Sequence, residues 1–499
     1  MLMVLIGTKI IFTILFAFTH NSNFYYDDSN TFRISLQNPS EIRKILAYEQ
    51  NLPLYYSILH FLFNLLGNSY LYGQLLNLLF WLISCYLFYL ISRKYIEKKT
   101  WNYLSLLLFV GSTSIGMYAY HLRMYSIIIC LSLYTFLISL KFMENRKFWH
   151  LVIIDIMLSI LSLLHMTTLL FSILVITSLT TFSLIKKIKS MALYTLLCII
   201  LVTQFVLVTS QVLTKHNPIS IYFNHGIEYI SRGKVYFFSV PSIFLFSKNA
   251  LEYDLFVYGI FILLSYKYLR VVLRKYKTDH KLLILTIYPI TFLLLVHTAY
   301  KYLQVRHFLY FVPFLYLTIA YSIYTDRGKY NRVAFSILLL FFLAANISDI
   351  VEWGIYLHSQ KTLCQEIRNI KQGAIITDYF NYNAIDYCSS DNADVSIYVL
   401  HKNKIESIKD YSEIDILTKQ AQNTGHASFS VSHGLYTDYI NKDTKNRLIS
   451  EGNIKEDTAY VIFAQFPRKV FLKEEVELLE GFELIDKKDP AILVFSRKT

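Results

Sequence analysis

The sequence predicts a polytopic α-helical membrane protein that ends in a small α/β domain. Hydrophobic residues make up 55% of the 499-residue chain and charged residues only 17%, whereas roughly a quarter of a soluble chain is charged. Several apolar runs approach the roughly 20 residues that a helix needs to cross a bilayer. From about residue 360 onward charged and polar residues return, and short apolar segments alternate with helical patterns, which is typical of an α/β domain.

The apolar runs predict about eleven membrane spans. They occupy residues 2–19, 70–92, 102–119, 124–141, 149–166, 167–185, 191–212, 251–269, 282–300, 305–323 and 332–350. The first run has neither a basic n-region nor a small-residue cleavage site, so we expect it to remain as a span. Residues 149–185 form one continuous apolar stretch, which also fits two short helices that dip into one leaflet.

Short loops rich in Lys and Arg set the predicted orientation. They lie at residues 93–99, 146–147, 186–189, 274–277 and 327–332. We expect the protein to lie in the plasma (inner) membrane, and the positive-inside rule places these loops and the N-terminus on its cytoplasmic side. The first loop (20–69), a second large loop (213–250) and the tail then lie outside. We therefore predict a transmembrane domain over residues 1–350 and an external α/β domain over residues 351–499.

The first external loop carries two helix signals. The segment Asn38-Pro39-Ser40-Glu41 predicts a helix start with Ser40 as the N-cap. Residues 54–66 are apolar and end at Gly67, and this segment is too short to span a membrane. We expect it to lie along the membrane interface, and a half-buried helix packed on the bundle is the alternative.

The tail contains four short apolar segments that predict buried strands. They are residues 374–378, 395–400, 459–463 and 491–495. Helical patterns follow the second and third strands, at residues 411–420 and 473–479. No glycine-rich phosphate loop occurs in the tail, so the sequence does not indicate a nucleotide site there.

The five cysteines and the net charge exclude several functions. Cys85, Cys130 and Cys198 lie in apolar runs and are expected in the core, whereas Cys364 and Cys388 lie in the tail, where a disulfide is an open option. No Cys-x-x-Cys occurs, so a zinc or redox motif is not supported. The net charge of +13 comes largely from the loops, which indicates topology and lipid headgroups rather than nucleic acid.

An acidic pair, Asp27-Asp28, follows Tyr25 and Tyr26 in the first external loop. Carboxylates can deprotonate an acceptor hydroxyl or hold a divalent cation, and both roles suit group transfer. Two adjacent side chains rarely reach the same point, so we expect one to act while the other organises the loop. The alternative is a solvated turn, because Asp, Ser and Asn are common turn residues.

Basic residues at the outer ends of predicted spans form a second candidate group. Arg123, Lys301, Arg306 and His307 all lie at such ends. A guanidinium can bind a phosphate through two parallel hydrogen bonds, although contact with external headgroups explains the same residues. His165 lies within the stretch 149–185 and either faces an outer cavity or is a core residue with a local hydrogen-bond partner.

Five short motifs occur in the order found in one known family. They are Asp27-Asp28, the segment from Asn51-Leu52-Pro53-Leu54-Tyr55-Tyr56 to Leu66-Gly67, His121-Leu122-Arg123-Met124-Tyr125, Leu164-His165-Met166-Thr167-Thr168, and the segment from Arg306 to Pro313. Through them residues 1 to about 350 resemble the polytopic GT-C glycosyltransferases of the protein O-mannosyltransferase and aminoarabinose-transferase type, which are family 39-like. Such enzymes often end in an external α/β domain.

The resemblance implies inverting transfer of a sugar from a polyprenyl-phosphate donor to an acceptor on the outer face of the membrane. The acceptor class stays open between a protein, lipid A and another envelope glycan. By the resemblance Asp27 is the base, or the ligand of a divalent metal, and Asp28 assists it. Arg123, Arg306 and Lys301 would neutralise the departing lipid phosphate. The cavity and substrate residues would be Tyr25, Tyr26, Tyr55, Tyr56, Tyr125, His165 and His307.

Two departures from the family pattern leave other functions open. Asp28 stands where the family has Glu, and Asn51-Leu52 stands where it has His-Pro, so an inactive scaffold of the same fold is one alternative. A transporter or lipid flippase is another. Transporters place ionisable residues near the bilayer midplane and often contain inverted repeats. This sequence concentrates charge at the outer rim and shows no obvious repeat, which favours the enzyme.

Overall fold

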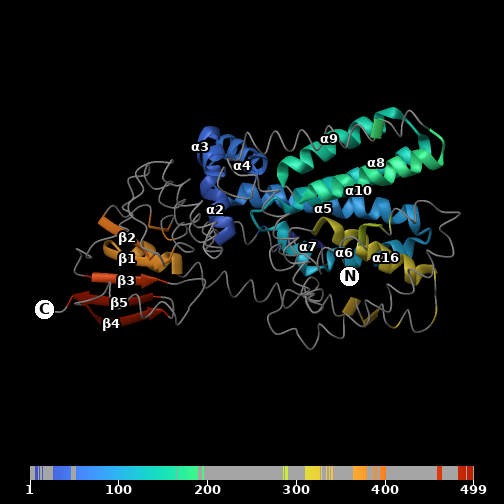
Figure 1. Ribbon diagram of the computed structural model, residues 1–499. Coiled ribbons are helices and arrows are strands. Elements are labelled where there is room, and N and C mark those ends of the chain that lie inside the picture. Colours follow the sequence, from blue (N-terminus) through green and yellow to red (C-terminus); the bar gives the residue numbers. More distant parts are fainter. Residues whose placement is uncertain are drawn as a thin grey trace, which may run out of the picture. The chain divides into compact units, whose positions relative to one another are not determined.

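A computed structural model describes two parts of the chain that form compact units. The described residues are 26–46, 52–165, 167–188, 309–325, 363–378, 394–400, 458–462, 482–489 and 492–497, with single residues and very short pieces elsewhere. The first unit comprises residues 1–18 and 50–351, and the second comprises residues 19–49 and 352–499. The second unit thus joins part of the predicted first external loop to the tail. Figure 1 shows the described elements.

The first unit is helical. Its helices are α4 (Pro53–Leu66), α5 (Tyr70–Tyr95), α6 (Lys99–Val110), α7 (Thr113–Gly116), η1 (Met117–Ala119), α8 (Tyr125–Asn145), α9 (Phe148–Leu164), α10 (Thr168–Ile185) and α16 (Val312–Thr325). Among the described residues, α5, α8 and α10 are long and apolar enough to cross a membrane. The helices predicted at 70–92, 124–141 and 167–185 are therefore confirmed, while the total number of spans stays a prediction.

The long helices pack through small and aromatic side chains. Helix α8 packs on both α5 and α9, and α5 also packs on α6, and α8, α9 and α10 lie roughly alongside one another in Figure 1. Phe88 of α5 stacks on Phe109 of α6 with ring centroids 4.7 Å apart. In the last turn of α5, Lys94 forms a salt bridge with Glu144 of α8 at 2.8 Å. The continuous stretch 149–185 is two helices, α9 and α10, which meet at residues 165–167.

The single span predicted over residues 102–119 is wrong. Helix α6 ends at Val110, and residues 113–119 form the short α7 and η1. Ser112 explains the break, because its hydroxyl accepts the backbone N–H of Ile115 at 3.4 Å and the hydroxyl of Tyr316 at 2.7 Å. A serine that bonds in this way competes with the regular helix. With only 12 residues, α6 is shorter than a helix that crosses the bilayer.

Helix α4 matches the predicted apolar segment 54–66. It begins with Pro53 in the first turn and ends at Gly67, whose φ of 109° is a conformation that residues other than glycine rarely adopt. One face packs on α5 and α9, with Tyr55, Tyr56, Leu59 and Phe63 buried. The opposite face exposes Phe61 and Leu65. These contacts favour the alternative prediction, a half-buried helix packed on the bundle.

The second unit begins with two helices, α2 (Tyr26–Ser35) and α3 (Pro39–Leu46). The predicted N-cap Ser40 is wrong, because the cap is Asn38. The side-chain oxygen of Asn38 accepts the backbone N–H groups of Ser40 at 3.1 Å and Glu41 at 3.0 Å. Pro39 can then occupy the first helical position, where its missing N–H has no cost.

The tail contains a mixed five-stranded sheet in the order β2-β1-β3-β5-β4. The strands are β1 (Gln372–Asp378), β2 (Asp394–Leu400), β3 (Thr458–Ile462), β4 (Phe482–Asp489) and β5 (Ile492–Arg497). Strand β1 pairs parallel with β2 and β3, whereas β5 pairs antiparallel with β3 and β4. The four predicted strands match β1, β2, β3 and β5, and β4 was not predicted.

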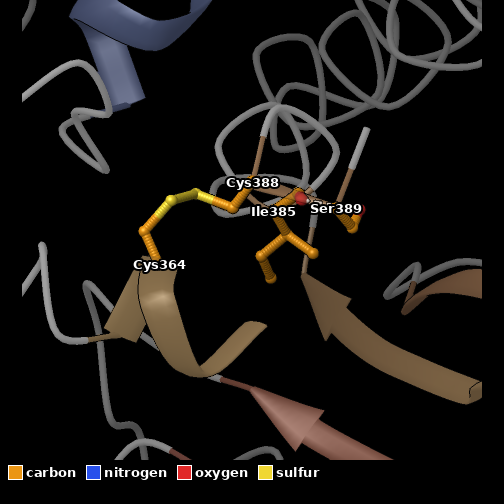
Figure 2. The surroundings of a disulfide bond; sticks show 4 residues. All are labelled: Cys364, Ile385, Cys388 and Ser389. Carbon is orange, nitrogen blue, oxygen red and sulfur yellow. Dashed lines mark hydrogen bonds between the residues drawn. A yellow bond between two sulfur atoms is a disulfide. The ribbon is translucent and has the colours of Figure 1, made fainter. Parts of the chain in front are cut away.

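A disulfide joins the two tail cysteines. Cys364 lies in a helical segment at residues 363–369, and its bond to Cys388 spans 24 positions of sequence. Figure 2 shows Cys388 beside a turn in which the N–H and the hydroxyl of Ser389 both donate to the Ile385 carbonyl at 2.8 Å. The option that the sequence left open is therefore realised in the structure.

Several predicted elements lie wholly or mostly outside the described residues. They are the spans 2–19, 191–212, 251–269, 282–300 and 332–350 and the helices 411–420 and 473–479. These elements stay predictions.

Candidate functional site

Residues from four of the five sequence motifs come together in the first unit. The segments containing Tyr55, Arg123 and His165 lie far apart in the sequence, on α4, before α8 and after α9. The structure joins them through Asn77 of α5 and through Tyr125 at the start of α8.

Asn77 of α5 connects the first two segments. Its side-chain nitrogen donates to the backbone carbonyls of His121 and Arg123, the latter at 3.0 Å. The Tyr55 hydroxyl of α4 lies 3.0 Å from the same nitrogen and 3.3 Å from the Asn77 side-chain oxygen. The neighbouring Tyr56 is also buried, and its ring lies edge-on to Tyr55 at 6.1 Å. One amide therefore links α4, α5 and the chain before α8.

Arg123 lies in an irregular segment, residues 120–124, between η1 and α8. Its backbone N–H donates to the His121 carbonyl at 2.9 Å, which makes a tight bend. The residue is only 6% exposed, and this burial disfavours the alternative in which Arg123 contacts external headgroups at the surface. Charges interact more strongly where water is excluded. A guanidinium in this position can therefore bind an anion more tightly than an exposed one.

His165 lies in the break between α9 and α10, with 3% of its surface exposed. Its Nδ1 accepts the backbone N–H of Thr167 at 3.3 Å and lies 2.7 Å from the Thr167 hydroxyl. Because Nδ1 accepts, the neutral ring carries its hydrogen on Nε2. The Tyr310 hydroxyl donates to the Thr167 carbonyl at 2.6 Å, which ties this break to the segment that leads into α16.

Aromatic rings connect the arginine segment with the histidine segment. The rings of Tyr118 and Tyr125 are 4.6 Å apart, and the ring of Tyr125 is 6.1 Å from His165. His121 lies 5.3 Å from Tyr120 and 6.0 Å from Tyr118. All of these residues are buried. Tyrosine and histidine side chains of this kind can stack on a sugar ring and donate hydrogen bonds to its hydroxyls.

The acidic pair lies in the second unit, in the first turn of α2. The alternative of a solvated turn is wrong for Asp28, because it is helical and only 1% exposed. A carboxylate in the first turn is stabilised by the helix dipole. Tyr26 and Asp27 share the helix backbone, but their side chains lie outside the described residues.

Four predicted site residues are not described at all, namely Tyr25, Lys301, Arg306 and His307. Their roles stay predictions. In the described part of the chain no three His, Cys, Asp or Glu side chains gather as a metal site, and the metal role of Asp27 is likewise untested. Asn77 was not predicted as a site residue, and Tyr310 was included only as part of the motif from Arg306 to Pro313. A signal for Asn77 existed, because an amide within an apolar span is costly and needs a partner.

Comparison with known proteins identifies the fold. No family model and no curated protein matches the chain. Among solved structures, ArnT from Cupriavidus metallidurans bound to undecaprenyl phosphate matches with a TM-score of 0.52 and 9% identity, over 99% of this chain and 97% of that one. Apo ArnT from the same organism matches with a TM-score of 0.53 and 8% identity over the same shares. The chain therefore has the GT-C fold of the aminoarabinose transferase ArnT, as the motifs predicted.

Proposed function

We propose that this protein is an integral membrane glycosyltransferase that moves a sugar from a polyprenyl-phosphate donor to an acceptor on the outer face of the membrane. The observation that carries the proposal is the meeting of Tyr55, Arg123 and His165 in one buried cluster. The motifs containing these residues were the ones that resembled GT-C transferases. The likeness to ArnT in complex with undecaprenyl phosphate supports a polyprenyl-phosphate partner.

In the proposed mechanism, Asp27 deprotonates the acceptor hydroxyl, or holds a metal that orients it, and Asp28 assists. As the bond between sugar and phosphate breaks, negative charge develops on the phosphate oxygens. Arg123, with Arg306 and Lys301, neutralises that charge, and such groups lower the barrier most when they are fixed in advance. His165 and Tyr125 line the cavity for the sugar or the lipid, as do His307 and the tyrosines at positions 25, 26, 55 and 56.

The disulfide of the tail supports the proposed orientation. Disulfides persist in oxidising compartments such as the periplasm or the cell exterior and are rare in the cytosol. The bond between Cys364 and Cys388 is therefore consistent with an external tail. An external tail also agrees with the basic loops of the sequence, which the positive-inside rule assigns to the cytoplasm.

A reconstituted transfer assay tests the proposal. The purified full-length protein is placed in liposomes with undecaprenyl-phosphate carrying a labelled sugar, and peptide, lipid A and glycan acceptors are offered separately. We expect label to move to one acceptor class. We expect Asp27→Asn and Arg123→Ala each to lower the rate by about 100-fold or more while expression stays normal.

The control is Lys94→Ala, which removes an exposed ion pair with Glu144 and should leave the transfer rate unchanged. Transfer of the lipid between leaflets without transfer of the sugar would identify a flippase. Binding of the lipid without transfer of the labelled sugar to any acceptor would identify a scaffold. Either result would overturn the proposed enzyme.

A further inference from the structure

Asn77 is a fully buried amide within the membrane-spanning helix α5. Burying an amide among apolar side chains is costly unless its hydrogen bonds are satisfied. The Asn77 amide has partners on both its atoms. Those partners come from α4 and from the segment before α8, and none belongs to α5 itself.

The partners determine how the amide is oriented. The carbonyls of His121 and Arg123 can only accept, so the side-chain nitrogen of Asn77 must face them. Its two hydrogens serve these two carbonyls. The Tyr55 hydroxyl then donates to the side-chain oxygen of Asn77 at 3.3 Å. All three groups are satisfied at once, and this requires the three segments to keep their relative positions.

The backbone held by Asn77 is the bend that carries Arg123. Residues 120–124 are not helical, so their carbonyls lack the partners that a helix would supply, and such groups are costly inside a membrane protein. Gly73, one turn earlier on α5, lets Leu122 pack directly against this helix, because a Cβ at position 73 would overlap the Leu122 side chain. Gly73 and Asn77 are four residues apart and share one face of α5, so this face contacts the bend at two points.

We propose that Asn77 is a positioning residue that sets the place of the Arg123 guanidinium for the phosphate of the lipid donor. This inference rests on the proposed function, in which Arg123 binds that phosphate. Asn77 does not contact the substrate in this proposal. It acts through the main chain of residues 121–123, and Tyr55 orients its amide from the other side.

The test compares two isosteric substitutions in the full-length protein. Asn77→Asp keeps the shape but turns a donor into an acceptor that faces two carbonyls. The matched control is Asn102→Asp. Asn102 is also buried, and it bonds Ser92 at 3.1 Å and the Ile96 carbonyl at 2.8 Å. By the rise of a helix, Ser92 lies about 22 Å from Asn77 along α5.

The readouts are the Kd for undecaprenyl phosphate in nanodiscs and the thermal midpoint. We expect Asn77→Asp to raise the Kd about tenfold, because small displacements of a positioned group weaken its interactions strongly. Asn77→Asp and Asn102→Asp should lower the thermal midpoint by similar amounts. Asn102→Asp should leave the Kd within about twofold of the wild type. If Asn77→Asp does not fold, Tyr55→Phe serves as a second, milder variant. We expect it to raise the Kd by a smaller factor.

The double variant of Asn77→Asp with Arg123→Ala separates this inference from the proposed function. If Asn77 acts through Arg123, the double variant binds no more weakly than Arg123→Ala alone. Should Arg123→Ala weaken binding while Asn77→Asp and Tyr55→Phe behave like Asn102→Asp, the positioning role is refuted and the proposed function stands. A wild-type Kd in Arg123→Ala would instead refute the phosphate role and, with it, the role of Asn77.

Discussion

Burial distinguishes Arg123 from basic residues at a helix end such as Arg93 and Lys94, in the last turn of α5. Both of these residues are exposed, where solvent and salt screen a charge within about 8–10 Å. Arg123 is 6% exposed, and it lies in the segment between the buried rings of Tyr118 and Tyr125, which are 4.6 Å apart. Its planar guanidinium presents donors in a fixed fork that matches two phosphate oxygens. At the scale of single residues, we therefore expect the proposed phosphate site to depend on the geometry of the cation as well as on its charge.

Arg123→Lys tests that dependence. Lysine keeps the positive charge but loses the fork, so we expect kcat/KM for the polyprenyl-phosphate donor to fall by about 10- to 100-fold. The measurement is a donor titration in the transfer assay. Arg93→Lys serves as the control, because Arg93 lies exposed over the Tyr89 ring at 5.9 Å. Equal activity of Arg123→Lys and the wild type would reject bidentate binding.

The two acidic residues are expected to respond differently to the loss of charge. Adjacent residues of a helix point about 100° apart, so Asp27 and Asp28 cannot approach one atom from the same side. Asp28 is buried in the first turn of α2, where its charge favours the helix. We expect Asp28→Asn to destabilise its unit by about 1 kcal/mol and to lower turnover only several-fold.

Asp27→Asn should show the reverse pattern, with normal stability and almost no turnover. Thermal unfolding and transfer rates of both variants, measured in parallel, decide between the two roles. If Asp28→Asn removes turnover at unchanged stability, the assignment of the base to Asp27 is incorrect.

At the scale of elements, small residues allow α5 to approach its neighbours. Gly73 lies against Leu122 and Leu59, and Ser84 and Ser92 are buried further along the helix. Small residues at helix contacts are typical of membrane proteins, because they let backbones come close. The contact at Gly73 also sets the distance between α5 and the bend that carries Arg123.

Gly73→Ala should therefore displace the bend. The added methyl group would overlap Leu122, which is fully buried, and such overpacking costs about 1–3 kcal/mol. We expect a lower thermal midpoint and a higher KM for the donor. Leu122→Ala removes the overlapping atoms, so the double variant should lose less stability than the two single losses combined. Simple additivity would show that Gly73 and Leu122 do not share this contact.

Sequence patterns predicted the elements whose signals are local. Long apolar runs predicted α5 and α8, and the apolar run 54–66 with Gly67 after it predicted α4. The break after Val110 was missed although Gly111, Ser112 and Thr113 follow it, because small residues are also common within membrane-spanning helices. Only the contact of Ser112 with the distant Tyr316 reveals its role. Strand β4 was missed because its sequence, FELIDKKD, is charged. Its pairing with β5 contains register shifts, as bulges produce.

The same distinction applies to the candidate site. Arg123 and His165 were identified from motifs, but their connection runs through partners that are distant in the sequence. Asn77 bonds residues 44 and 46 positions away, and Tyr310 bonds Thr167 across 143 positions. A single sequence carries no record of such pairs. The polar character of position 77 within an apolar run indicates a need for partners but does not identify them.

At the scale of the whole molecule, the proposal depends on the side of the membrane that the tail occupies. The disulfide between Cys364 and Cys388 gives a direct assay of that side. In intact cells carrying Cys198→Ser, a membrane-impermeant maleimide should label the tail only after an impermeant reductant has opened the disulfide. Cys85 and Cys130 are buried in helices and should stay unlabelled.

Adding Cys364→Ser should expose Cys388 to the maleimide without any reductant, because its partner thiol is then absent. This variant separates a closed disulfide from a tail that the reagent cannot reach. A cytoplasmic tail would instead be labelled only after the membrane is permeabilised, and its cysteines would be reduced from the start. That result would place residues 19–49 on the wrong side for an externally loaded donor, because they belong to the same compact unit as the tail.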